Sequence, residues 1–203
     1  QELSEEASQF AALLGKRQEL RDTFTYDGRN HWQSHDLNIH YEWANIKDLV
    51  LPALSYNSQT MNLGHRFQFG ADLPRTLNFN VNYSRREDAQ RLGSSALTLN
   101  QELYLEHSKT FSTAYHYIFS RFTGFGGDTR MHTGALSLQH RLYESLRTEL
   151  SLQASHSDLS TGSQKLYGGR FNADYRKKLS SEGMLLANLG GRYEIENDRI
   201  QGK

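Results

Sequence analysis

The chain has 203 residues, a length that suits one domain or one part of a larger one. Its 23 Lys and Arg balance 23 Asp and Glu, so no bulk charge favours a nucleic-acid partner, and none is predicted. The absence of Cys excludes disulfides and thiolate chemistry in this chain. Its 11 Tyr, 10 Phe and 2 Trp are too many aromatic residues for a disordered protein.

Residues 1–20 are predicted to be an N-terminal lead-in to the main domain. Phe10, Leu13 and Leu14 would share one face of a short helix, which would pack at a rim or dock as a plug. The first residues are acidic and lack the basic region of a signal peptide, which leaves open a mature chain or an internal piece. No stretch approaches the ~20 apolar residues of a membrane helix, so no helical span is predicted.

From about residue 21 onward, apolar and polar residues alternate. Residues 77–83 read Leu-Asn-Phe-Asn-Val-Asn-Tyr, which on a strand gives one apolar and one polar face. The same pattern recurs along the chain and predicts ten or eleven strands, most of about 10–14 residues. Strands of soluble proteins usually have ~5–6 residues, whereas tilted strands that span a bilayer need ~9–11. The strand lengths therefore favour a membrane protein.

The segments between these strands have the composition of compact turns. Examples are residues 72–75, 160–163 and 180–183, which are rich in Gly, Pro, Ser and Asp. Pro52 lies in segment 48–57, where the alternation is weaker. Because proline cannot donate a backbone hydrogen bond within a sheet, this segment is expected to be a bent or edge strand. Such short connections leave no room for crossover helices, so all strands are expected to be antiparallel.

Residues 21–203 are therefore predicted to form an all-β, antiparallel up-and-down transmembrane β-barrel. Either the barrel closes at ten or eleven strands, or these strands are part of a larger barrel. The predicted lumen-lining residues are Asn38, His40, Glu42, Asn62, Arg66, Gln68, Asn78, Asn80, Asn82, Arg170, Asn172, Asp174, Asn188, Arg192 and Glu194. The predicted lipid-facing residues are Leu37, Ile39, Tyr41, Trp43, Leu63, Phe67, Leu77, Phe79, Val81, Tyr83, Leu185, Leu189 and Tyr193.

No catalytic residue, metal ligand or cofactor is predicted. His31 and His35 have a spacing that suits a metal site on a helix, but on a strand they would lie ~13 Å apart. A lipid-hydrolysing barrel needs a Ser hydroxyl within hydrogen-bond reach of a His. On a strand, residues two apart share a face, but the residue two after His156 is Asp158 and not a serine, and Ser157 points to the opposite face. The glycine-rich segment 124–128 matches no phosphate-binding pattern and is expected to be a loop.

Long alternating strands, many Tyr residues, short turns and the lack of Cys make residues 21–203 resemble Gram-negative outer-membrane β-barrels. Within that class the chain is somewhat similar to large porins that sheathe multihaem cytochromes. The resemblance implies an outer-membrane location, a bilayer around the protein and a protein partner in the lumen or periplasm. It implies the function of a channel, porin or conduit wall with a polar lumen. The last residues, 198–203, lack the terminal aromatic residue that usually closes such barrels.

Two other functions remain open from the sequence. One is a soluble or surface β-sheet protein whose apolar faces pair, with a structural or adhesive role. The other is a barrel lipid hydrolase.

Overall fold

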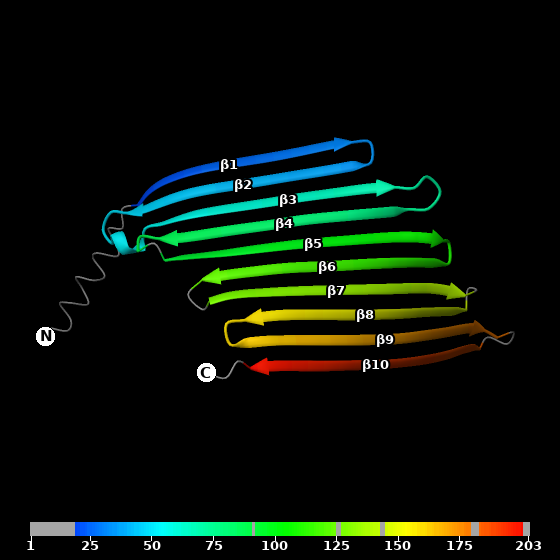
Figure 1. The fold of residues 1–203 in the computed structure, drawn as a ribbon. Helices are drawn as coiled ribbons and strands as arrows, with labels where there is room; N and C mark the ends of the chain where they lie inside the picture. The colour runs from blue at the N-terminus through cyan, green and yellow to red at the C-terminus, as the bar shows by residue number, and fades with distance from the viewer. Residues whose placement is uncertain (1–18, 91, 125–126, 143–144, 180–182, 201–203) are drawn as a thin grey trace, which may run out of the picture.

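The computed structural model describes residues 19–90, 92–124, 127–142, 145–179 and 183–200. These residues form one sheet of ten antiparallel strands, in which every strand pairs with its neighbours in the sequence (Figure 1). The predicted all-β meander is therefore confirmed. The sheet is open, because β1 and β10 form its two edges and do not pair with each other. The predicted lead-in, residues 1–20, lies almost wholly outside the described residues.

The strands are longer than expected, with 14 to 17 residues each. Their bounds are β1 Glu19–Trp32, β2 His35–Asp48, β3 Tyr56–Phe69, β4 Arg75–Asp88, β5 Gly93–Ser108, β6 Phe111–Gly124, β7 Gly127–Leu142, β8 Leu146–Leu159, β9 Gly162–Lys178 and β10 Met184–Ile200. Within the described part of the chain, no helix is long and apolar enough to cross a membrane.

Most connections are tight turns whose residues suit the backbone they adopt. Gly70 after β3 has a φ of 92°, a left-handed conformation that glycine adopts at little cost. A Cβ there would lie 2.4 Å from the carbonyl oxygen of Leu73, so no other residue fits without a backbone shift. Ser160 and Thr161 join β8 to β9, in the predicted turn 160–163.

The segment around Pro52 was predicted wrongly. It forms no bent or edge strand but a short 3-10 helix, η1 (Pro52–Leu54), between β2 and β3. The carboxylate of Asp48 accepts hydrogen bonds from the backbone N–H groups of Val50 and Leu51, at 2.9 and 2.8 Å. The hydroxyl of Ser55 accepts one from the backbone N–H of Asp48. These local bonds satisfy backbone groups that a strand would pair with a neighbour.

The strand register places every residue on one of two faces. Directly paired residues share a face and successive residues alternate, so the register assigns each residue from its partners. A register shift between Glu106 and Ser108 interrupts this alternation on β5. We call the face that carries Phe79 the apolar face and the face that carries Asn80 the polar face. One row on the polar face crosses all ten strands through Asp27, His40, Asn62, Asn82, Thr98, Ser120, Met131, Ser157, Gln164 and Asp198.

The strands are staggered relative to this row. Asp27 lies eight residues from the start of β1, whereas Asp198 lies two residues from the end of β10. The strands end on two opposite sides of the sheet. We call the side where β1 begins and β10 ends the near end, and the other side the far end. The near end is at the left in Figure 1. The stagger is six residues at the near end and nine at the far end, so the sheet is sheared along its whole width.

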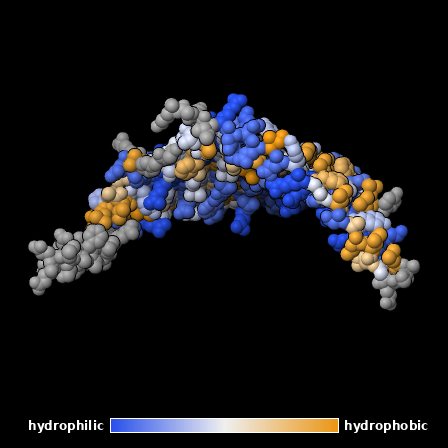
Figure 2. All heavy atoms as spheres, turned by 90° about the horizontal axis from the view of Figure 1, so that it is seen from below, coloured by the Kyte–Doolittle hydropathy of each residue, from blue (hydrophilic) through white to orange (hydrophobic). Residues whose placement is uncertain are grey.

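The sheet is a single curved layer and has almost no core (Figure 2). Among the described residues, the buried hydrophobic side chains are only Ala44 and Ile46, both on β2. Large apolar side chains remain open to the surroundings, for example Leu189 and Tyr193, which are 67% and 69% exposed. A sheet of this kind cannot be stabilised by its own burial, so its apolar face needs another apolar phase against it.

Candidate functional site on the polar face

All fifteen predicted lumen-lining residues lie on the polar face, and all thirteen predicted lipid-facing residues lie on the apolar face. The register shows that the two sets are separated by the sheet. It does not test what each face contacts, so the assignments to lumen and lipid stay predictions.

Side chains on the polar face hydrogen-bond to one another across neighbouring strands. His40 Nδ1 lies 2.7 Å from a carboxylate oxygen of Asp27, and Asn78 donates to Glu102 at 3.2 Å. His116 Nε2 lies 2.8 Å from the amide oxygen of Asn100. These bonds link neighbouring strands and satisfy the polar groups that take part in them.

The polar face also carries shallow hollows that gather some of the predicted residues. One, of about 270 Å³ over β1 to β4, is lined by Asn38, His40, Asn62, Asn80 and Asn82 among others. A second, of about 370 Å³ over β8 to β10, is lined by Arg170, Arg192 and Glu194 among others. The structure therefore divides the predicted lining into two groups, at the β1–β4 side and the β8–β10 side of the sheet.

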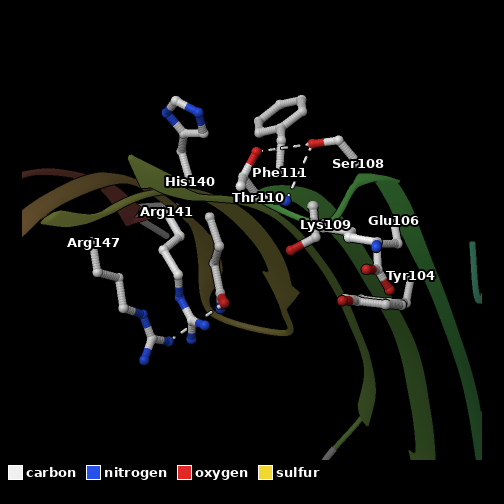
Figure 3. Close-up of a pocket in the computed structure, with 11 residues that line it drawn as sticks. Tyr104, Glu106, Ser108, Lys109, Thr110, Phe111, His140, Arg141 and Arg147 are labelled. Carbon is white, nitrogen blue, oxygen red and sulfur yellow. Dashed lines mark hydrogen bonds between the residues drawn. The ribbon is translucent and has the colours of Figure 1, made fainter. Parts of the chain in front are cut away.

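The space beside the backbone differs between individual glycines on the two faces. A Cβ built on Gly64, on this face, would lie 3.0 Å from the amide oxygen of Asn80. Cβ atoms built on Gly134 and Gly191, on the apolar face, would meet nothing within 4 Å. In Figure 3 the strands bend toward the side on which Arg147 and Tyr104 lie. This bend makes the polar face the concave one.

The apolar face carries aromatic rings at two levels that the sequence analysis did not identify, with further aromatic residues between them, among them Phe79, Tyr115 and Phe171. On three strands, two aromatic residues on this face are eight positions apart: Phe24 and Trp32 on β1, Phe111 and Phe119 on β6, and Tyr167 and Tyr175 on β9. On β2 the same spacing separates Trp43 from His35. A period-two alignment of strands in the sequence would have shown this spacing. We call the two levels the near and far aromatic rows.

The far aromatic row is a continuous stack at its β1–β3 side. His35 stacks on Trp32 and on Phe67, with ring centroids 5.0 and 4.3 Å away. Phe67 in turn stacks on Phe69 at 5.2 Å. His35 Nδ1 lies 3.1 Å from Nε2 of His65, so one proton can be shared between these two rings. The stack joins three strands at the far end.

At the near end of the apolar face, the β6–β7 hairpin carries a group of ion-paired side chains. Asp128 accepts hydrogen bonds from Arg121 at 2.9 and 3.0 Å and from Arg130 at 3.0 Å. Arg121 and Arg130 are directly paired across β6 and β7, so Asp128 compensates two like charges that face each other. This triad was also missed, because its members come together only when the β6–β7 hairpin is folded.

Between the aromatic rows, the centre of the apolar face is hollowed. The hollow has a volume of about 610 Å³ and is lined mainly by apolar residues, among them Leu103, Tyr115, Leu136, Leu152 and Ala154. Its floor includes Gly134, where no side chain fills the space. Small residues in the middle of β7 and β8 produce this depression.

The histidines considered in the sequence analysis lie apart. His31 is on the polar face of β1 and contacts Asp36, whereas His35 is on the apolar face of β2. His156 lies 3.2 Å from Asp158 on the apolar face, and Ser157 is on the opposite face. In the part of the chain that the structure describes, no three His, Cys, Asp or Glu residues are grouped as metal ligands would be.

No family model, curated protein or solved structure matches this chain.

Proposed function

We propose that the chain forms part of the wall of an outer-membrane β-barrel, with its polar face toward a lumen and its apolar face toward lipid. It would then serve as a channel, a porin or the sheath of a conduit. The partners in this proposal are the bilayer and a protein in the lumen or periplasm.

The spacing of the two aromatic rows carries the proposal. Eight residues on a strand span ~26 Å, which at a strand tilt of roughly 25–35° is a height of about 22–24 Å. The apolar band of transmembrane barrels is ~25 Å tall, with aromatic girdles at both borders. Trp32 belongs to the far row and Trp43 to the near row, so the two Trp residues of the chain are at the two borders. The Arg121–Asp128–Arg130 triad lies beyond the near border, where charge is expected to meet water.

The shear of the sheet supports the same proposal. A stagger of six to nine residues over nine strand steps corresponds to a strand tilt of roughly 25–35°, just below the ~35–45° of transmembrane barrels. With ten strands, β1 and β10 run antiparallel, so they could close the barrel by pairing with each other. Further strands between these edges would instead make a wider barrel.

Quenching of tryptophan fluorescence by brominated lipids tests the proposal directly. The chain is reconstituted as two single-Trp variants, Trp32→Phe and Trp43→Phe, in bilayers brominated either near the headgroup or near the chain ends. Both remaining Trp residues should be quenched more strongly by the shallow bromines, because both rows would lie at interfaces.

Two further variants in a background without Trp serve as controls. Phe79→Trp, midway between the rows, should be quenched most by the deep bromines. Tyr104→Trp, on the polar face of β5, should be quenched by neither lipid. Equal quenching of the Trp at 79 and the Trp at 104 would contradict the proposal. So would a chain that stays folded and monodisperse without detergent, which is the behaviour of a soluble sheet protein with paired apolar faces.

A further inference from the structure

Three pairs of arginines lie directly opposite each other on neighbouring strands of the described sheet. They are Arg121 with Arg130, Arg170 with Arg192, and Arg141 with Arg147. Directly opposed side chains have Cβ atoms ~4.5–5.5 Å apart, and like charges at such positions repel. A negative charge nearby therefore stabilises each pair.

Two of the pairs have a carboxylate from the chain. Asp128 bridges Arg121 and Arg130, and Glu194 forms an ion pair with Arg192. The third pair differs from these two. Within the described residues, Arg141 and Arg147 form no ion pair, and the guanidinium of Arg147 donates only to the amide oxygen of Gln139, at 3.4 Å.

A third arginine approaches the same place on the polar face. Arg176 is on β9, two residues beyond Asp174, which is directly opposite Arg147. Arg141, Arg147 and Arg176 line one hollow of about 220 Å³, together with Ser145. Asp174 also lines it, but its carboxylate accepts a hydrogen bond from Asn188 and forms no ion pair with the arginines.

A second hollow of about 230 Å³ adjoins the first and shares Arg141 and Arg147 with it. Lys109 and Glu106 are among its other lining residues. Figure 3 shows Arg141 and Arg147 side by side on the concave side of the strands, while His140 and Phe111 project from the opposite side. Among the described residues, four cations and two carboxylates thus line the two hollows, so the described lining carries more positive than negative charge.

We propose that Arg141, Arg147 and Arg176 form a binding site for a phosphate-type oxyanion. A planar guanidinium presents paired N–H donors that match the oxygens of such an anion, and three of them around one hollow can bind it from several sides. The anion would supply the negative charge that Asp128 and Glu194 supply to the other two pairs. Inorganic phosphate and the phosphate of a phospholipid headgroup share this chemistry.

Isothermal titration of inorganic phosphate into the full chain, folded in an uncharged detergent, tests the site. The wild type should bind phosphate, and Arg141→Gln and Arg147→Gln should each weaken the affinity about tenfold or more. Arg147→Lys keeps the charge but not the paired donors and should fall in between. Circular dichroism checks that each variant is folded. If a glutamine variant does not fold, the affinity of Arg147→Lys still tests the site.

Arg192→Gln is the matched control. It removes one arginine of an opposed pair on the same face, but that arginine already has Glu194 as a partner, so phosphate affinity should not change. A parallel titration uses micelles containing phosphatidylglycerol. Binding of phosphate identifies a free oxyanion as ligand, and binding of phosphatidylglycerol alone identifies a lipid headgroup. Either assignment also requires that the Arg141→Gln and Arg147→Gln variants bind that ligand more weakly than the wild type.

The proposal is overturned if neither ligand binds, or if the wild type and the Arg141→Gln and Arg147→Gln variants bind equally. It does not depend on the membrane function proposed above. If the chain stays folded without detergent, the same phosphate titration is made in plain buffer. The two proposals can therefore fail separately.

Discussion

Trp32 at the end of β1 lies flat on His35 at the start of β2, with ring centroids 5.0 Å apart and an angle of 11° between the ring planes. The two residues are directly paired across the tight β1–β2 turn. The contact therefore fastens the edge strand to the rest of the sheet at its far end.

Replacing His35 with Ala should destabilise the folded chain by about 0.5–1.5 kcal/mol, the range measured for aromatic pairs. Unfolding in urea, followed by the fluorescence of Trp32 in a Trp43→Phe background, measures the change. His31→Ala is the control, because His31 lies on the opposite face and is exposed, and it should cost less. Equal losses would show that the stack contributes nothing.

An arginine in place of Phe79 should cost about 2–4 kcal/mol in a bilayer, the penalty for a cation at the midplane on the lipid side of a barrel. Asn80→Arg, one residue along the same strand, puts the charge on the polar face and should be close to neutral. Folding titrations of both variants in lipid vesicles give the difference. A similar cost for both would mean that the apolar face does not contact lipid.

Asp128→Asn should destabilise the β6–β7 hairpin, because it leaves Arg121 and Arg130 opposed without the carboxylate. Salt screens this repulsion, so the loss should shrink as ionic strength rises. Thermal unfolding at low and high salt measures both effects. Asp158→Asn, whose partner is a histidine, is the comparison and should depend on salt less strongly.

The two faces should respond differently to an added methyl group. Gly134→Ala meets open space and should stabilise by about 0.4–1 kcal/mol, since alanine restricts the unfolded chain. At Gly64 the same change would place Cβ 3.0 Å from the amide oxygen of Asn80, so that gain should be lost. Urea unfolding of the two variants measures the difference, and a larger gain at Gly64 would contradict the close contact with Asn80.

The meander was predictable from the sequence because its determinants are local. The alternation in residues 77–83 sets both faces of β4, and short turns leave antiparallel pairing as the only choice. The segment at Pro52 was misjudged because the backbone N–H groups of Val50 and Leu51 donate hydrogen bonds to the Asp48 carboxylate, and these bonds compete with strand pairing. The opposed arginines 141 and 147 could not be predicted, since their contact depends on the exact register of β7 and β8.

The neighbour-only pairing of the sheet also sets an order of events in folding. Each strand finds its partner within a few residues of a turn, and isolated hairpins form in about 1–10 μs. A pairing that covers the edges of β1 and β10 cannot be local, because the whole sheet separates them. Long-range pairings form slowly, and until then the two uncovered edges can pair with other chains. The chain therefore spends its most aggregation-prone interval with most of its hydrogen bonds already made.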